Sequence, residues 1–120
     1  MASKNLGKIT DYVSNKYDGS KPASFRTFMK DFELGVETLD IHITKQYLLL
    51  QSMLEGTPKE VAEAFIAEFK INNAQIVNGT RHEREEASRQ LMEELRAALR
   101  ENPAVVGTNP SLEHTAFGLA

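Results

Sequence analysis

Four apolar side chains, spaced three and four residues apart in the first third of the chain, constrain the fold most strongly. They are Phe25, Phe28, Phe32 and Val36. At 3.6 residues per turn, this spacing places all four on one side of an α-helix. Ser24 precedes them and is a good N-terminal cap. The pattern therefore predicts a helix over about 25–39 with one broad apolar face.

Apolar spacing and capping residues predict four more helices. Their expected ranges are about 3–16, 45–55, 58–70 and 81–101. Thr44 is expected to cap the second of these, whose residues are apolar nearly all round, as in a central buried helix. Thr57 with Glu60, and Thr80 with Glu83, have the spacing of capping boxes. Residues 72–79 are expected to form a loop with room for a short helical turn.

The fold expected from these ranges is all-α. It is a single small bundle of about five helices over 1–102, followed by a flexible tail over 103–120 that begins at Pro103. A chain of 120 residues fits one domain of this kind. The expected core consists of Phe25, Phe28, Phe32, Val36, Leu48, Leu50, Leu54, Val61, Phe65 and Phe69.

Composition excludes several classes of protein. The chain has no cysteine, which rules out disulfides, thiolate zinc sites and a cysteine nucleophile. Its formal net charge of -3 is opposite to the overall positive charge that holds nucleic-acid phosphates. No stretch is long and apolar enough to span a bilayer. We therefore expect a cytoplasmic, intracellular protein without a membrane partner.

The residues that could carry catalysis or bind metals do not form a known pattern. No two of the histidines, His42, His82 and His114, lie within five residues of each other. The adjacent carboxylates Glu85/Glu86 and Glu93/Glu94 are interleaved with arginines, which is typical of a solvated helix face. We therefore predict no enzyme activity, no cofactor and no metal site.

A second interpretation is a helix-turn-helix regulator that uses residues 59–83 to bind nucleic acid. Its recognition helix would begin near residue 73. The side chains that could reach base edges are Asn73, Gln75, Asn78 and Arg81. Gly79 inside that helix and the negative net charge oppose this alternative.

Residues 16–65 resemble the Gag capsid region of long-terminal-repeat retrotransposons, especially the BEL/Pao-type pattern. The turn Lys16-Tyr17-Asp18-Gly19 comes first, and the phenylalanine helix follows it. A third segment then contains Lys45, Tyr47-Leu48, Ser52-Met53-Leu54 and Gly56. The chain lacks the tryptophan that is common in the aromatic helix of the family and the cysteines of a zinc knuckle, so RNA packaging is not implied. The resemblance implies a single capsid-like lobe over about 16–70 that self-assembles into homo-oligomers.

The helix expected over 81–101 has an apolar strip that is narrow for a core helix, and a partner helix could cover such a strip. We therefore predict a self-association surface made of Leu91, Leu95, Leu99 and Met92. Under this prediction, Leu95→Glu separates oligomers without unfolding the domain. A groove for a protein or peptide partner is predicted at Phe25, Phe28 and Tyr47.

Overall fold

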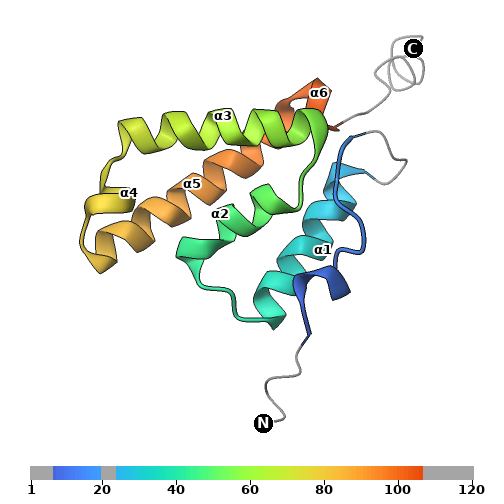
Figure 1. Cartoon of the computed structure of the whole chain (residues 1–120), viewed down its shortest axis with the longest axis horizontal. Coiled ribbons are helices and arrows are strands. Elements are labelled where there is room, and N and C mark those ends of the chain that lie inside the picture. The colour runs from blue at the N-terminus through green and yellow to red at the C-terminus, as the bar shows by residue number, and fades with distance from the viewer. Residues whose placement is uncertain (1–6, 20–23, 107–120) are drawn as a thin grey trace, which may run out of the picture.

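The computed structural model describes residues 7–19 and 24–106, which form a helical bundle without a β-strand (Figure 1). In chain order, the elements are the 3₁₀ turn η2 (Ile9–Asp11) and the helices α1 (Phe25–Thr38), α2 (Ile43–Ser52), α3 (Gly56–Asn72), α4 (Gln75–Asn78), α5 (Arg81–Glu101) and α6 (Pro103–Val106). The helices α3 and α5 run in opposite directions, and α4 connects them at one end of the bundle (Figure 1). The prediction of an all-α bundle is confirmed.

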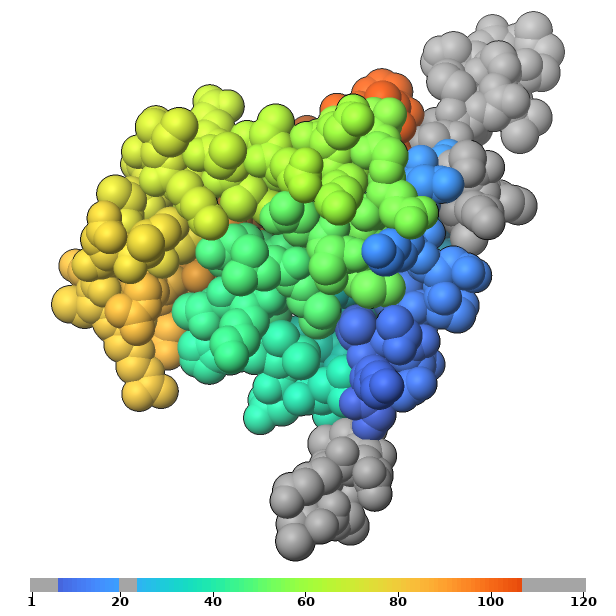
Figure 2. Space-filling view, in the orientation of Figure 1, coloured from blue at the N-terminus to red at the C-terminus, as the bar shows by residue number. Residues whose placement is uncertain are grey.

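The long helix α5 is the centre of the bundle and contacts α2, α3, α4 and α6. Figure 2 shows α5, in orange, only at one end, because α2 and α3 cover the rest of it from this side. The side chains of Leu91, Leu95 and Leu99 are 0% exposed, and that of Met92 is 1% exposed. The prediction that these four residues form a self-association surface is therefore wrong, because helices of the same molecule cover the strip. Leu95→Glu would place an unpaired charge inside the core and would unfold the domain.

Tyr17 connects the two ends of the described chain. Its ring stacks on Phe28 with 5.2 Å between ring centroids and meets the edge of Phe25 at 5.4 Å. Its hydroxyl donates a buried hydrogen bond of 2.7 Å to the carbonyl oxygen of Val105 in α6. Because Val105 is 0% exposed, α6 belongs to the bundle, and the predicted start of a flexible tail at Pro103 is wrong. Residues 107–120 of that predicted tail lie outside the described residues.

A short extended pairing determines where α3 begins. The amide of Tyr17 donates to Met53 O, and the amide of Glu55 donates to Tyr17 O, both at 2.9 Å. This pairing holds Glu55 in the extended conformation of an N-cap residue, and Gly56 follows it with a left-handed φ of 62°. The capping box predicted at Thr57 is therefore wrong, because α3 has already begun at Gly56.

The helix predicted over 3–16 is also wrong where the structure describes it, since only Ile9–Asp11 is helical and residues 3–6 lie outside the described part. Gly7 has a φ of 102°, which an α-helix does not contain. The segment instead packs on α1 at Gly35, where a Cβ atom would lie 2.8 Å from Ile9 Cδ1 and 3.0 Å from Tyr12 Cβ. Tertiary packing thus outweighs the helical spacing of this segment.

The predicted core is confirmed for Phe25, Phe28, Phe32, Val36, Leu50, Leu54 and Phe69, which are all buried. Val61 and Phe65 are partly buried against it. Leu48 is 50% exposed, and its placement in the core is wrong. Tyr47 and Leu50 are the buried residues of α2, and Leu48 lies about 100° around the helix from Tyr47. The helix α2 is therefore buried on one side only, and the prediction of a central, mostly buried helix is wrong.

Candidate interaction surface

The ends of α5 are determined by local sequence, as predicted. Thr80 Oγ1 accepts a hydrogen bond from the amide of Glu83 at 3.1 Å, and Glu83 Oε1 accepts one from the amide of Thr80 at 2.9 Å. This capping box satisfies two of the free amides at the start of the helix. Asn102 ends the helix in an extended conformation directly before Pro103.

One side of α5 carries a row of charged and polar side chains, which we call the outer stripe. It consists of His82, Glu86, Arg89, Glu93, Arg96 and Arg100. Steps of four, three, four, three and four residues keep these positions within about 80° around the helix axis. All six side chains reach the surface, with Arg96 only partly exposed. The four middle residues, Glu86, Arg89, Glu93 and Arg96, therefore alternate in charge along this side of α5, and Arg100 adds a second cation at its C-terminal end.

A groove with a volume of about 760 Å³ lies beside the C-terminal half of this stripe, and we call it the basic groove. It is lined by Ser24, Phe25, Arg26, Met29, Lys30, Glu33, Arg96, Arg100 and Val106. Its four cationic side chains face a single carboxylate, which gives a formal charge of +3. That carboxylate, on Glu33, pairs with Nε of Arg96 at 3.3 Å and connects α1 with α5.

A second hollow, with a volume of about 840 Å³, lies along the stripe from His82 to Glu93, and we call it the acidic hollow. It is lined by Gln75, His82, Glu83, Glu86, Ala87, Arg89, Gln90, Glu93 and Glu94. Its four carboxylates and one guanidinium give a formal charge of -3 when His82 is neutral. Inside it, Nη1 of Arg89 pairs with Glu86 at 3.0 Å. Two hollows of equal and opposite formal charge therefore lie next to each other along α5.

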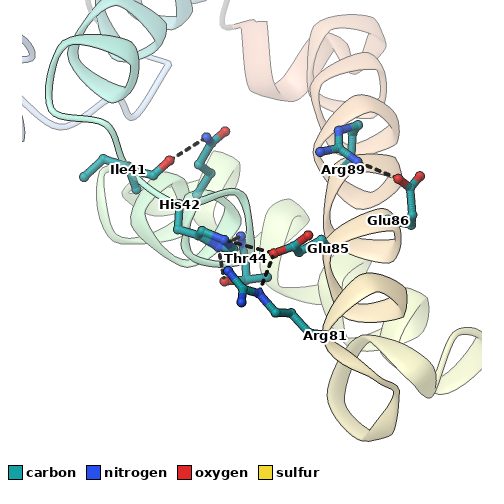
Figure 3. A network of polar contacts seen from close by, with 8 residues as sticks. Ile41, His42, Thr44, Arg81, Glu85, Glu86 and Arg89 are labelled. Carbon is teal, nitrogen blue, oxygen red and sulfur yellow. Dashed lines mark hydrogen bonds and ion pairs between the residues drawn. The ribbon is translucent and has the colours of Figure 1, made fainter.

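A polar network joins α2 to the first turns of α5 (Figure 3). His42 Nδ1 accepts a hydrogen bond from the amide of Thr44 at 3.2 Å, so His42 caps α2 and the predicted cap at Thr44 is wrong. Its Nε2 atom lies 3.2 Å from Glu85 Oε2. Glu85 also accepts from Arg81 Nε at 3.3 Å. The Arg81 hydrogen bond lowers the pKa of the Glu85 carboxyl below its ordinary value.

Glu85 points toward His42, whereas Glu86 points away from it (Figure 3). The two neighbouring carboxylates therefore have different partners and different roles. Glu85 holds α2 to α5, and Glu86 remains on the exposed stripe.

The residues of the predicted aromatic groove are buried rather than open to a partner. Phe25, Phe28 and Tyr47 are each between 5% and 6% exposed. Phe25 lines the basic groove, but Phe28 packs between the rings of Tyr17 and Phe32. Tyr47 has the Nζ atom of Lys70 over its ring at 5.5 Å, and burial raises the pKa of its hydroxyl. The prediction of a groove formed by the three rings together is therefore wrong.

The recognition helix of the nucleic-acid alternative is not formed. The helix α4 has four residues, and Gly79 ends it in an extended conformation. The side-chain amide of Asn73 donates to the carbonyl oxygen of Phe69 at 2.9 Å and so caps the end of α3. Gln75 and Asn78 are exposed on α4, and Arg81 belongs to α5, where it pairs with Glu85. The predicted helix over 73–83 is wrong because Gly79 and the Thr80 capping box separate two helices there.

Of the residues that line the two hollows, the sequence interpretation named only Phe25 and Gln75 as candidate contact residues, each as part of a different site. The detectable pattern was the four-three spacing of charged residues in 82–100, together with Arg26/Lys30 and Arg96/Arg100 at i, i+4. The charges of 81–101 were interpreted as one solvated face. That interpretation missed their separation into a more acidic N-terminal part and a basic C-terminal part.

Within residues 7–19 and 24–106, no three histidine, aspartate or glutamate side chains lie together as a metal site requires. None of the helices described there combines the length and hydrophobicity of a membrane span. Comparisons of the chain with protein-family models, with curated proteins and with solved structures find no match. The resemblance to a Gag capsid lobe therefore stays a prediction.

Proposed function

We propose that this chain is a non-enzymatic self-association module, of the kind that its resemblance to a Gag capsid lobe implies. The contact surface of this module is the outer stripe of α5 with the two hollows beside it. This replaces the leucine strip, which is buried inside the molecule. The proposal includes an intracellular location, which the cysteine-free sequence favours.

One observation carries the proposal: adjacent hollows with formal charges of +3 and -3 on one side of the same helix. Complementary charge steers association and suppresses wrong partners. A surface that carries both signs in two separate halves is complementary to a second copy of itself. Phe25, Met29 and Val106 add apolar surface inside the basic groove, which a partner can cover.

Nucleic acid is the competing ligand for the four cations of the basic groove. The acidic hollow lies directly beside them, and its carboxylates repel a phosphate backbone that continues along α5. The helix that would read base edges is absent. Self-association therefore has the stronger support.

Sedimentation velocity over a range of protein concentrations tests the proposal. A contact made of exposed charges is weak, so we expect a Kd between about 10 μM and 1 mM at low salt. The weight-average sedimentation coefficient should rise with concentration at about 50 mM salt and should rise much less at about 500 mM salt. A chain that stays monomeric at about 1 mM and low salt would contradict the proposal.

A further inference from the structure

We infer that two copies of this chain pair through antiparallel α5 helices, related by a two-fold axis that passes beside residue 91. This inference rests on the proposed self-association and specifies its geometry. The four charged residues in the middle of the outer stripe carry it. They are Glu86, Arg89, Glu93 and Arg96.

The spacing of these four residues is symmetric about residue 91. Glu86 lies five residues before it and Arg96 five residues after it, while Arg89 and Glu93 each lie two residues from it. An antiparallel two-fold pairing centred there places each residue opposite the one that is equally far on the other side of the centre. Glu86 then faces Arg96 of the second copy, and Arg89 faces Glu93 of the second copy. The two-fold axis doubles each contact, which gives four ion pairs of opposite sign.

A parallel pairing in the same register would place like charges opposite each other. Each of the four residues would face its own copy, so carboxylates would oppose carboxylates and guanidinium groups would oppose guanidinium groups. Like charges placed opposite each other disfavour association. Antiparallel helices also align their dipoles favourably. The charge pattern thus selects one orientation.

The basic groove lies beside the stripe, on its α1 side. Arg26 and Lys30 of α1 stand beside the C-terminal half of α5, in the basic groove. In an antiparallel pair they lie level with the N-terminal half of the second copy's α5, where Glu83 and Glu86 line the acidic hollow. The outermost stripe positions, His82 and Arg100, face each other without attraction when His82 is neutral.

The ion pairs within one molecule do not prevent these arginines from pairing with carboxylates of the second copy. Arg89 pairs with Glu86, and the two side chains are 55% and 59% exposed. Arg96 pairs with Glu33, and these side chains are 33% and 50% exposed. Exposed pairs are weak and are screened by salt, so each arginine can take a carboxylate of the second copy at little cost.

Charge reversal at one facing pair tests the inference. In Arg89→Glu, both copies of the pair become Glu–Glu, and in Glu93→Arg both become Arg–Arg. Each single reversal should weaken association by at least about tenfold at low salt. An equimolar mixture of the two variants should associate within about threefold of the unmodified chain, because every pair in the heterodimer has opposite signs. The double variant R89E/E93R should also associate with itself.

Two matched controls separate this effect from a general change of charge. Glu60→Arg on α3 and Lys45→Glu on α2 change exposed side chains that line neither hollow. Both should associate like the unmodified chain. Circular dichroism at 222 nm and the urea midpoint should show that every variant remains folded, since Arg89 and Glu93 are exposed.

The outcomes distinguish the inference from the proposed function. Association that resists both reversals, or a mixture that stays monomeric, would overturn the antiparallel pairing while self-association stands. A monomer at every concentration would overturn both. Association that nuclease treatment abolishes would also overturn both, since nucleic acid would then bridge the copies.

Discussion

Truncating Leu95 to alanine tests whether the leucine strip of α5 belongs to the core of one molecule. Leu95 is 0% exposed and lies on the side of α5 that the other helices cover. Complete burial places the loss for Leu95→Ala at about 3–4 kcal/mol, within the range of about 2–5 kcal/mol for buried leucines. For a domain of this size, such a loss lowers Tm by roughly 12–25 °C. Leu48→Ala is the matched control, because Leu48 is 50% exposed and should lose less than about 1 kcal/mol.

Urea unfolding, followed by circular dichroism at 222 nm, measures both variants. It should be run at a protein concentration at which the chain is monomeric, so that dissociation does not contribute. The slope of the free energy of unfolding with urea should stay constant, and the midpoint of Leu95→Ala should fall. Equal stability losses for Leu95→Ala and Leu48→Ala would refute the placement of this strip in the core. A Leu95→Ala loss that appears only at associating concentrations would restore the strip as an interface.

Three further predictions follow from single contacts. Tyr17→Phe removes the buried hydrogen bond to Val105 O and should lower the free energy of unfolding by about 1–3 kcal/mol in urea titrations. An unchanged urea midpoint would contradict the role of this bond. Replacing a glycine inside a helix with alanine normally stabilises the helix by about 0.8–1 kcal/mol. At Gly35, however, the new Cβ would lie 3.0 Å from Tyr12 Cβ, so thermal unfolding of Gly35→Ala should show a lower Tm rather than a higher one. Glu85→Gln removes a carboxyl whose pKa is lowered by its guanidinium hydrogen bond. A lowered pKa contributes stability that is present above the ordinary value of 4.5 and is lost as the pH falls below it, so this variant should show a flatter acid limb in stability measured between about pH 6 and 3.

The starts of α1 and α5 have local causes and were predictable from the sequence. Ser24 accepts a hydrogen bond from the amide of Thr27 at 3.1 Å, and α1 begins where that cap predicts. The capping box of Thr80 and Glu83 likewise places the start of α5. In both cases the residues that decide the boundary lie within one turn of it.

Features that depend on contacts between distant segments were not predictable. The start of α3 follows from a backbone pairing with Tyr17, and the order of Pro103–Val106 follows from a hydrogen bond that spans 88 residues. Whether the narrow apolar strip of α5 lies in the core or at an interface also depends on distant segments. A strip of that width requires a covering helix, but the pattern alone does not say whether that helix comes from the same molecule.

The sequence predicted only part of the candidate surface. Arg81 and Glu85 form the i, i+4 ion pair that their spacing favours, but Arg89 pairs with Glu86 rather than with Glu85 or Glu93, which are four residues away. The cations that α1 adds to the basic groove depend on how α1 lies beside α5, which periodicity does not determine.

Distances between two copies of one labelled position test the antiparallel pairing most directly. The chain has no cysteine, so His82→Cys and Gln90→Cys each provide a single site for a nitroxide label. At a rise of 1.5 Å per residue and about 10 Å between helix axes, the backbone positions of the two copies should be about 29 Å apart at residue 82 and about 10 Å apart at residue 90. Electron paramagnetic resonance of the associated protein should therefore give a long distance at 82 and a short one at 90. Similar short distances at both positions would indicate parallel helices, and the absence of any dipolar coupling would show that α5 does not form the contact.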